Sequence, residues 1–251
     1  MSRLPLSVVI PAFNEELRLR DTLDQLVGYL QSSRDSFEIL VVDDGSTDGT
    51  GEVAGQLARK NPAGMIRLVT HAGNRGKGFS VRQGALAAEG DLLLMTDADL
   101  STPIEELGKL ESALLTTPLD IAFGSRAVEG SSIQVHQPWY REALGKGFNR
   151  VMRLLTGLCF RDTQCGFKLF RMSTCRSLFE RQRLDGFVFD VELLFIAAKW
   201  QLRVAELPVA WHHSGDSRVR PVSHAPSVLV DLARLHLNNA HGLYDRGVGS
   251  A

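Results

Sequence analysis

The sequence reads DLLLMTDADLS at residues 91–101, where a short apolar run is followed directly by two aspartates. An apolar run of this length, bounded by polar residues, predicts a buried β-strand. Four similar runs precede residue 126, at residues 7–10, 38–42, 65–70 and 120–124. The first part of the chain therefore contains at least five short strands.

Segments of helical period lie between these runs. Leucines recur at three- and four-residue intervals at positions 19, 23, 26 and 30, and Val53, Ala54 and Leu57 follow the same spacing. Strands that alternate with helices predict right-handed βαβ units. We therefore expect an α/β fold with a mostly parallel sheet flanked by helices.

The composition is that of an ordinary globular domain. The 251 residues are 44% hydrophobic, and 28 lysines and arginines nearly balance 29 acidic residues. A net charge of −1 gives no overall attraction to polyanions, so nucleic-acid binding is not expected. Three cysteines without a CxxC pair argue against a zinc module or a set of disulfides, and favour a reduced, cytosolic setting.

Polar clusters follow several of the predicted strands. These clusters are Asn14-Glu15, Asp43-Asp44, Asp97 with Asp99, and Ser125-Arg126. Ligands of parallel sheets bind beyond the carboxyl ends of the strands, so these clusters predict a binding site. For Asp43 and Asp44 a second interpretation stays open, because DDGSTDGT is also typical of a loop that caps the next helix.

Asp97 and Asp99 are the strongest metal-ligand candidates. They follow a buried apolar run, and a carboxylate near a core is costly unless a cation or hydrogen-bond donors compensate its charge. Mg²⁺ held by two carboxylates keeps positions for water and phosphate oxygens. This pattern favours a substrate that carries a diphosphate.

The familiar phosphate-loop patterns are absent from the sequence. GNRGKGFS at residues 73–80 lacks the GxxxxGK[ST] spacing, and no GxGxxG follows the first strand. P-loop NTPases and dinucleotide oxidoreductases are therefore disfavoured. Arg75 and Lys77 could still contact phosphate from this glycine loop, or could belong to a solvated turn.

Taken together, the motifs resemble a known family. SVVIPAFNEE (7–16), VVDDGSTDGT (41–50), GNRGKG (73–78) and DADLS (97–101) resemble family 2 glycosyltransferases of the GT-A fold. GSR (124–126), RDTQCGFKLF (161–170) and FDVELL (189–194) are similar to dolichyl-phosphate β-glucosyltransferases, with polyprenyl-phosphate mannose synthases as relatives. The resemblance covers about residues 5–240.

This resemblance implies one GT-A catalytic domain over residues 1–251. Residues 5–126 would form the half that binds the nucleotide sugar, and residues 127–240 the half that binds the acceptor. The implied contacts to the nucleotide sugar are Pro11, Ala12, Asn14, Glu15, Asp43, Asp44, Lys77, Asp97 and Ala98. Asp97 and Asp99 would hold Mg²⁺ or Mn²⁺, with Ser101, His212 or His213 as a further ligand.

The implied reaction inverts the anomeric carbon and moves a hexose to a polyprenyl phosphate. A phosphate acceptor is already ionised, so the site needs cations more than a strong base. The candidate cations are Arg126, Lys168, Arg141, Arg218 and Arg220. The acids that could orient the sugar or the acceptor are Asp162, Asp190 and Glu192, although the two acids at 190 and 192 could simply begin a helix.

A membrane-contact segment is predicted at residues 139–160. Apolar residues at 144, 148, 151, 155 and 158 form a stripe beside four basic residues, which is typical of a helix lying in a membrane interface. The same stripe could instead pack on the sheet or on a second subunit in a homodimer. A second stripe, at residues 228–235, is expected to pack internally.

Eukaryotic relatives carry an amino-terminal transmembrane helix, whereas here the first strand begins almost at once. We therefore expect peripheral attachment at the cytosolic membrane face. The preferred donor is UDP-glucose. The alternatives are a mannose synthase that uses GDP-mannose and a family 2 enzyme with a soluble acceptor.

Overall fold

The computed structural model describes residues 5–62, 64–133, 147, 150–212 and 221–247, with the side chains of 221–226 left aside. Seven strands form one sheet in the order β3-β2-β1-β4-β7-β5-β8. Their bounds are β1 Leu6–Ala12, β2 Phe37–Asp43, β3 Ile66–Thr70, β4 Leu92–Met95, β5 Ile121–Ser125, β7 Lys168–Arg171 and β8 Val204–Pro208. A small second sheet pairs β6 (Ser132–Ile133) with β9 (Ala210–Trp211) in parallel.

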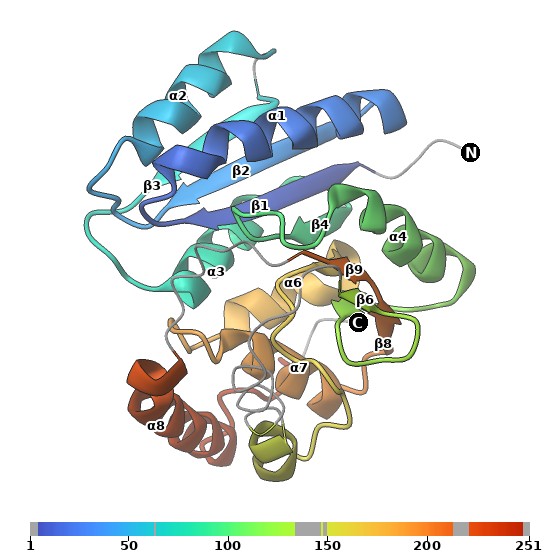
Figure 1. Ribbon diagram of the computed structural model, residues 1–251. Helices are drawn as coiled ribbons and strands as arrows, with labels where there is room; N and C mark the ends of the chain where they lie inside the picture. The colour runs from blue at the N-terminus through green and yellow to red at the C-terminus, as the bar shows by residue number, and fades with distance from the viewer. Residues whose placement is uncertain (1–4, 63, 134–146, 148–149, 213–220, 248–251) are drawn as a thin grey trace.

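Helices cover both faces of the large sheet (Figure 1). The helices are α1 Glu16–Ser33, α2 Thr50–Lys60, α3 Lys77–Ala87, α4 Leu107–Thr116, α6 Met172–Arg181, α7 Phe189–Lys199 and α8 Pro221–Ala240, with a 3₁₀ turn η1 at Ile104–Glu106. Helices α1, α2 and α4 pack on one face, and α3, α6 and α7 pack on the other. The fold is a single-domain α/β fold.

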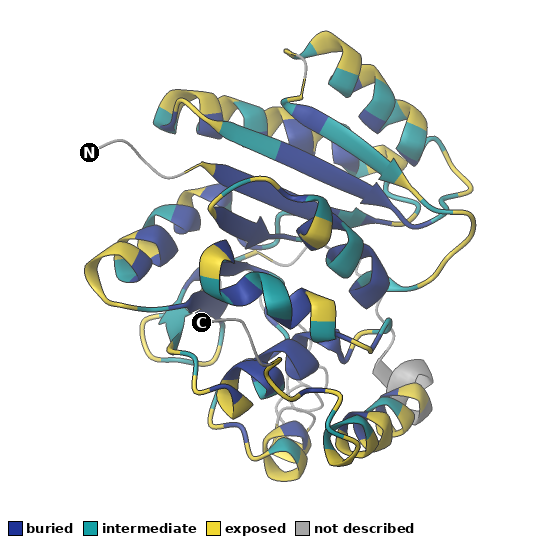
Figure 2. Ribbon diagram, turned by 180° about the vertical axis from the view of Figure 1, so that it is seen from behind, coloured by how far each residue is buried: buried dark blue, intermediate teal, exposed yellow. Residues whose placement is uncertain are grey.

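The strands supply both cores because their side chains alternate between the two faces. Val8 and Ile10 of β1 belong to the core under α1, whereas Val9 between them belongs to the core under α3 and α7. A strand that is buried on both sides consists of consecutive apolar residues, which is the pattern seen in the sequence. Figure 2 shows the inner strands of the sheet largely buried and the helices exposed along their outer faces, whereas the outer strands β3 and β8 are mostly of intermediate burial.

The five strands predicted before residue 126 are confirmed, each within two residues of its predicted bounds. The leucine-rich helix and the helix at Val53–Leu57 are also confirmed, as α1 and α2. The sequence analysis did not predict β7, which runs antiparallel between β4 and β5. This strand is KLFR, whose two apolar residues are too few to show a periodic pattern.

Strand β7 matters because of its register. Lys168 pairs with Met95 of β4 on one side and with Phe123 of β5 on the other. Asp97 lies two residues beyond Met95, and Arg126 lies three residues beyond Phe123. The antiparallel strand therefore begins with a lysine at the edge of the sheet where β4 and β5 end.

The predicted membrane segment is described in part. Residues 150–156 are helical, with Val151 and Leu154 exposed by 48% and 83%, while Leu158 is buried. Residues 139–146, 148 and 149 lie outside the described residues, as do His213, Arg141, Arg218 and Arg220.

The second stripe packs internally as predicted at Val228, Leu232 and Leu235, whereas Leu229 of that stripe is 61% exposed. Among the helices in the described ranges, none has the length and apolar character required to cross a bilayer.

Candidate active site

Charged side chains from four elements meet at the carboxyl ends of the central strands. Asp97 follows β4, Arg126 follows β5, Lys168 begins β7 and Lys77 begins α3. Lys77, Lys168 and Arg126 all act against the burial of Asp97 and lower its pKa, with Lys77 as the main one of the three. The structure thus brings together residues that are far apart in the sequence, since Lys77 and Lys168 are separated by 91 positions.

The contact at the centre of this cluster joins Lys77 and Asp97. The Lys77 Nζ atom lies 2.6 Å from Oδ1 of Asp97, and both side chains are partly exposed. Burial alone would lower the pKa of Lys77, but Asp97, Asp190 and Asp99 outweigh it and raise this pKa. Burial would raise the pKa of Asp97, but Lys77 holds it below its usual range. Asp97 is therefore an ionised carboxylate that faces a cation.

A buried ion pair lies beside this contact. Nζ of Lys168 is 2.6 Å from Oδ1 of Asp190, and the lysine side chain is fully buried. The ammonium group also donates to the carbonyl oxygen of Cys165. Burial raises the pKa of Asp190, although Lys168 and Lys77 act against this shift. Lys168 forms an ion pair with Asp190 and helps to lower the pKa of Asp97. Its direct contact with an acceptor phosphate stays a prediction.

Asp162 fixes the position of Arg126. Its two carboxylate oxygens accept from Nε and Nη2 of Arg126 at 2.7 and 2.8 Å, and Oδ2 also accepts from the Arg126 backbone N–H at 3.0 Å. Asp162 is buried, and its own backbone N–H donates to Glu206. The Arg126 side chain remains 32% exposed. Asp162 therefore orients an arginine that still has donors free to face a ligand.

The predicted nucleotide loops form one network. Both oxygens of Asp44 accept backbone N–H groups of the glycine loop, from Arg75 at 2.9 Å and from Gly76 at 2.7 Å. Oδ1 of Asp43 accepts from the Ser46 N–H, and Oδ1 of Asn14 accepts from the Thr47 N–H. These bonds shape the loops after β1 and β2. These side chains therefore hold the loops together, and their contact with a nucleotide stays a prediction.

The other residues predicted to contact the nucleotide sugar also lie at the carboxyl ends of the strands. Pro11 and Ala12 end β1, and the Ala12 carbonyl accepts from the Asp44 N–H. The carbonyl of Ala98 accepts from the Thr22 hydroxyl at 2.6 Å. Glu15 forms an ion pair with Arg18 at 2.7 Å.

Glu192 is separate from the charged cluster. Its oxygens accept from the backbone N–H groups of Arg183 and Leu184 and from the hydroxyl of Tyr244. These partners belong to the loop before α7 and to the segment after α8. A direct role for Glu192 with the sugar or acceptor stays a prediction.

The chain is similar to proteins of one family. Residues 7–179 match the family described as glycosyl transferase family 2. A dolichyl-phosphate beta-glucosyltransferase of Trichomonas vaginalis is 39% identical over 94% of this chain and 72% of its own length. The human protein of that name is 38% identical over 86% of this chain and 70% of its own length.

The chain belongs to glycosyl transferase family 2. The resemblance predicted from its motifs is confirmed, and the chain is a glycosyltransferase. Solved structures share its fold: mannosyl-3-phosphoglycerate synthase of Rubrobacter xylanophilus has a TM-score of 0.69 at 18% identity, covering 98% of this chain and 78% of that one.

A second solved structure contains a metal. Glucosyl-3-phosphoglycerate synthase of Mycobacterium tuberculosis, in complex with Mn²⁺, UDP and glucosyl-3-phosphoglycerate, has a TM-score of 0.67 at 21% identity. The match covers 94% of this chain and 79% of that one. At this identity the likeness establishes the fold, which is the predicted GT-A arrangement.

The residues of this glycosyltransferase suit a hard divalent cation. Asp97 and Asp99 offer carboxylate oxygens, which are the ligands that Mg²⁺ and Mn²⁺ take. The His212 N–H donates to the Ser101 carbonyl at 2.7 Å, so the chain that leads to position 213 passes beside the DADLS segment. Within the described ranges no group of three or more acidic, cysteine or histidine side chains converges on one point. Asp97 and Asp99 therefore stay the predicted metal ligands, and His213 lies outside the described residues.

Gly166 lies in the motif RDTQCGFKLF and contacts the site, although no role was predicted for it from the sequence. A methyl group at this position would overlap the carboxylate of Asp97. The glycine in QCGFK therefore leaves room for the Asp97 carboxylate. A glycine shortly before β7 is visible in the sequence, but only the antiparallel pairing of β7 with β4 shows that it faces Asp97.

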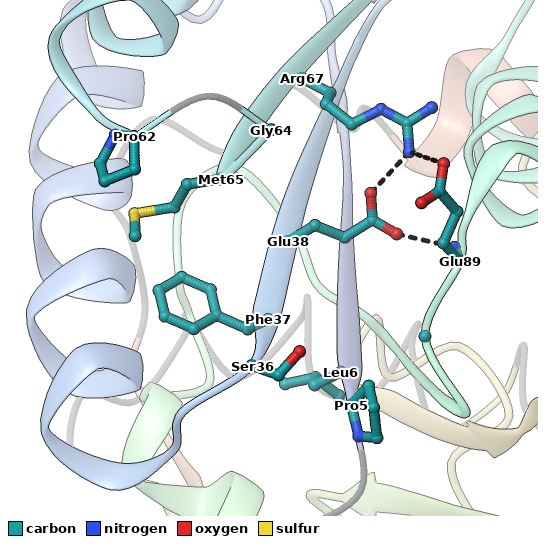
Figure 3. Close-up of a pocket in the computed structure, with 11 residues that line it drawn as sticks. Pro5, Leu6, Ser36, Phe37, Glu38, Pro62, Gly64, Met65, Arg67 and Glu89 are labelled. Carbon is teal, nitrogen blue, oxygen red and sulfur yellow. Dashed lines mark hydrogen bonds and ion pairs between the residues drawn. The ribbon is translucent and has the colours of Figure 1, made fainter.

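A hollow elsewhere on the surface lacks this chemistry (Figure 3). It lies at the amino ends of β1 and β2, opposite to the edge described above. Arg67 there lies 2.6 Å from Glu38 and 3.2 Å from Glu89, so its charge is neutralised. The candidate active site is therefore the charged edge at Asp97.

The Arg126–Asp162 pair predicts a pH dependence of stability. Burial would raise the pKa of Asp162, but Arg126 holds it below its usual range. The pair therefore stabilises the fold above the unfolded-state pKa of about 3.9, and this contribution is lost as pH falls through the lower folded-state value. Asp162→Asn should lower the free energy of unfolding by about 2 to 4 kcal/mol at pH 7, and by progressively less below pH 4.

Urea denaturation at several pH values between 3 and 7 measures this difference. Asp24→Asn, on the exposed face of α1, is the control and should change stability little at any pH. A difference between wild type and Asp162→Asn that stays constant across the range would contradict the assignment.

Proposed function

We propose that this glycosyltransferase moves glucose from UDP-glucose to a polyprenyl phosphate of the dolichyl type, with inversion at the anomeric carbon. The observation that carries the proposal is the meeting of Lys77, Arg126 and Lys168 with the paired aspartates at one edge of the sheet. A site with these charges suits a donor and an acceptor that both carry phosphate. The names of the relatives supply the sugar and the lipid.

The nucleotide half would hold the donor. The glycine loop lies against the loop after β2, because Asp44 accepts two of its backbone N–H groups. Lys77 then stands at the amino end of α3, where the helix dipole also favours an anion. The diphosphate of UDP-glucose would lie between this end of α3 and Asp97. Mg²⁺ or Mn²⁺ on Asp97 and Asp99 would neutralise the charge that develops on the leaving diphosphate.

The acceptor half would hold the lipid phosphate. Arg126 is fixed by Asp162 and its side chain stays partly exposed, so it would lose little side-chain entropy on binding a phosphate. A phosphate oxygen held there would attack the anomeric carbon from the side opposite to UDP. Because this oxygen is already ionised, Asp190 need only orient the reacting groups, and its ion pair with Lys168 fixes its own position. Arg141, Arg218, Arg220 and His213 remain predicted contributors from outside the described residues.

Transfer of radiolabel tests this function. Purified protein is given Mn²⁺, a short polyprenyl phosphate in detergent, and either UDP-[¹⁴C]glucose or GDP-[¹⁴C]mannose. Label should enter the organic phase from UDP-glucose and should fall by at least about 100-fold in Asp99→Asn, because a metal ligand is lost. EDTA should abolish transfer, and added Mn²⁺ should restore it.

Three outcomes contradict the proposal in different places. Label from GDP-mannose alone would make the enzyme a mannose synthase. Label that stays in the aqueous phase, with UDP released only when a soluble phosphate ester is added, would replace the lipid acceptor. Undiminished transfer by Asp99→Asn would remove the metal from the mechanism.

A lipid acceptor requires contact with a membrane, and we assign this contact to the helix at 150–156 together with α8. Val151, Leu154 and Leu155 are exposed beside Arg150 and Arg153. Leu229, Val230 and Leu237 of α8 are also exposed, and both helices lie at the end of the molecule away from α2 (Figure 1). Apolar side chains next to arginines suit an anionic lipid surface. The free cysteines of this chain are consistent with the cytosolic face.

Co-flotation with vesicles of phosphatidylcholine and phosphatidylserine tests this surface. Leu154→Glu should reduce the bound fraction about tenfold, since it places a negative charge among apolar contacts to lipid. Leu115→Glu is the matched control, because Leu115 is also exposed but lies on α4. Equal binding of both variants would exclude this surface. A dimer in solution that Leu154→Glu dissociates would assign the same surface to a homodimer.

A further inference from the structure

Glu192 holds a loop behind the active site. It is fully buried on α7, and its Oε1 and Oε2 atoms accept from the N–H groups of Arg183 and Leu184 at 2.8 and 2.9 Å. The hydroxyl of Tyr244 donates to Oε1 at 2.5 Å. Tyr244 is also fully buried, although it comes from the segment after α8 and lies outside the part of the chain that matches the family.

The loop that Glu192 holds, residues 182–186, packs directly against the glycine loop at residues 73–80. The side-chain amide of Gln182 donates to the Gly78 carbonyl at 2.7 Å, and the Phe79 N–H donates to the Asp185 carbonyl. A methyl group at Gly76 would overlap the Asp185 carbonyl, and one at Gly78 would lie 2.5 Å from the Leu184 carbonyl. The two backbones are thus in direct contact on both sides of Lys77.

Lys77 is the residue that this contact positions. Its neighbours Gly76 and Gly78 rest on the loop at 182–186, and its Nζ lies 2.6 Å from Asp97. A shift of the supporting loop would therefore move the lysine relative to the metal-binding carboxylate. The chain of contacts runs from Tyr244 through Glu192 and the loop to Lys77.

We propose that Tyr244 and Glu192 are positioning residues for the donor site, which fix the glycine loop and Lys77 in the arrangement that binds the diphosphate of the nucleotide sugar. This inference rests on the proposed donor site and extends it to the carboxyl-terminal segment. Tyr244 acts through one bond, because its hydroxyl donates to a carboxylate that already holds two backbone N–H groups. Burial raises the pKa of Tyr244, so the hydroxyl keeps the proton that it donates.

Removing the hydroxyl tests the link with the smallest change. In Tyr244→Phe the ring still fills its place in the core, but Glu192 loses a donor. The glycine loop should then occupy its binding position for a smaller fraction of the time, and the apparent Kd should rise by the inverse of that fraction. We expect UDP binding in the presence of Mn²⁺, measured by calorimetry, to weaken about fivefold to tenfold.

Asn238→Ala is the matched control. The Asn238 side-chain amide donates to the same hydroxyl at 3.0 Å, so this variant removes a bond to Tyr244 and leaves the bond from Tyr244 to Glu192. It should bind UDP like the wild type. Equal weakening of UDP binding in both variants would mean that only general packing around Tyr244 matters.

Amide hydrogen exchange without any ligand gives a second readout. Exchange of the Phe79 and Ser80 amides should accelerate about tenfold in Tyr244→Phe relative to the amides of α1, and should be unchanged in Asn238→Ala. Unchanged exchange in Tyr244→Phe, or a lowered Tm with unchanged UDP affinity, would overturn the inference. Faster exchange together with a wild-type protein that binds no UDP would support the positioning of the loop and contradict the proposed donor instead.

Discussion

A carboxylate at the end of a buried strand needs a cation opposite to it, and Lys77 is the cation that faces Asp97. Lys77, Arg126 and Lys168 bring three positive charges to this edge, and Asp97, Asp99, Asp162 and Asp190 bring four negative ones. One formal negative charge is left over. A divalent cation would turn this balance positive, which is the condition for holding two phosphate-bearing substrates side by side. The metal and the diphosphate are therefore linked by charge.

The two parts of the chain contribute differently to this balance. The part before residue 126 supplies Asp97 and Asp99 after β4, and Lys77 at the start of α3. The part after it supplies Lys168 through the antiparallel strand β7, and fixes Arg126 through Asp162. Asp162 is held in turn by Glu206 of β8, so the orientation of the exposed arginine depends on the far edge of the sheet.

Sequence patterns predicted the first five strands because each is an apolar run with polar ends, and this pattern needs no knowledge of the rest of the chain. They also predicted Asp97 and Arg126 as site residues, because the carboxyl ends of parallel strands must share one edge. Lys77 was predicted from the glycine loop before a helix and from the family resemblance. They did not predict β7, since two apolar residues carry no period. The sequence therefore gave no reason to expect Lys168 to be buried between β4 and β5.

The supporting contacts were harder to predict for a different reason. Gly166, Gln182 and Tyr244 act through contacts between segments that lie far apart in the sequence, and nothing in their local pattern names the partner. Glu192 shows the same limit, since its place at the start of a helix suited either the acceptor or the helix dipole. Only the fold shows that its partners are two backbone N–H groups and the hydroxyl of Tyr244.

We propose that Asp97 and Asp99 hold a divalent cation against the donor diphosphate, and that Lys77 then leaves Asp97 and turns toward the diphosphate. Anomalous diffraction at the manganese edge, from crystals grown with Mn²⁺ and UDP, tests this claim most directly. We expect one anomalous peak in contact with both aspartates and a diphosphate oxygen, with the Lys77 ammonium turned toward the diphosphate. UDP bound at this edge with no manganese on either aspartate would contradict it.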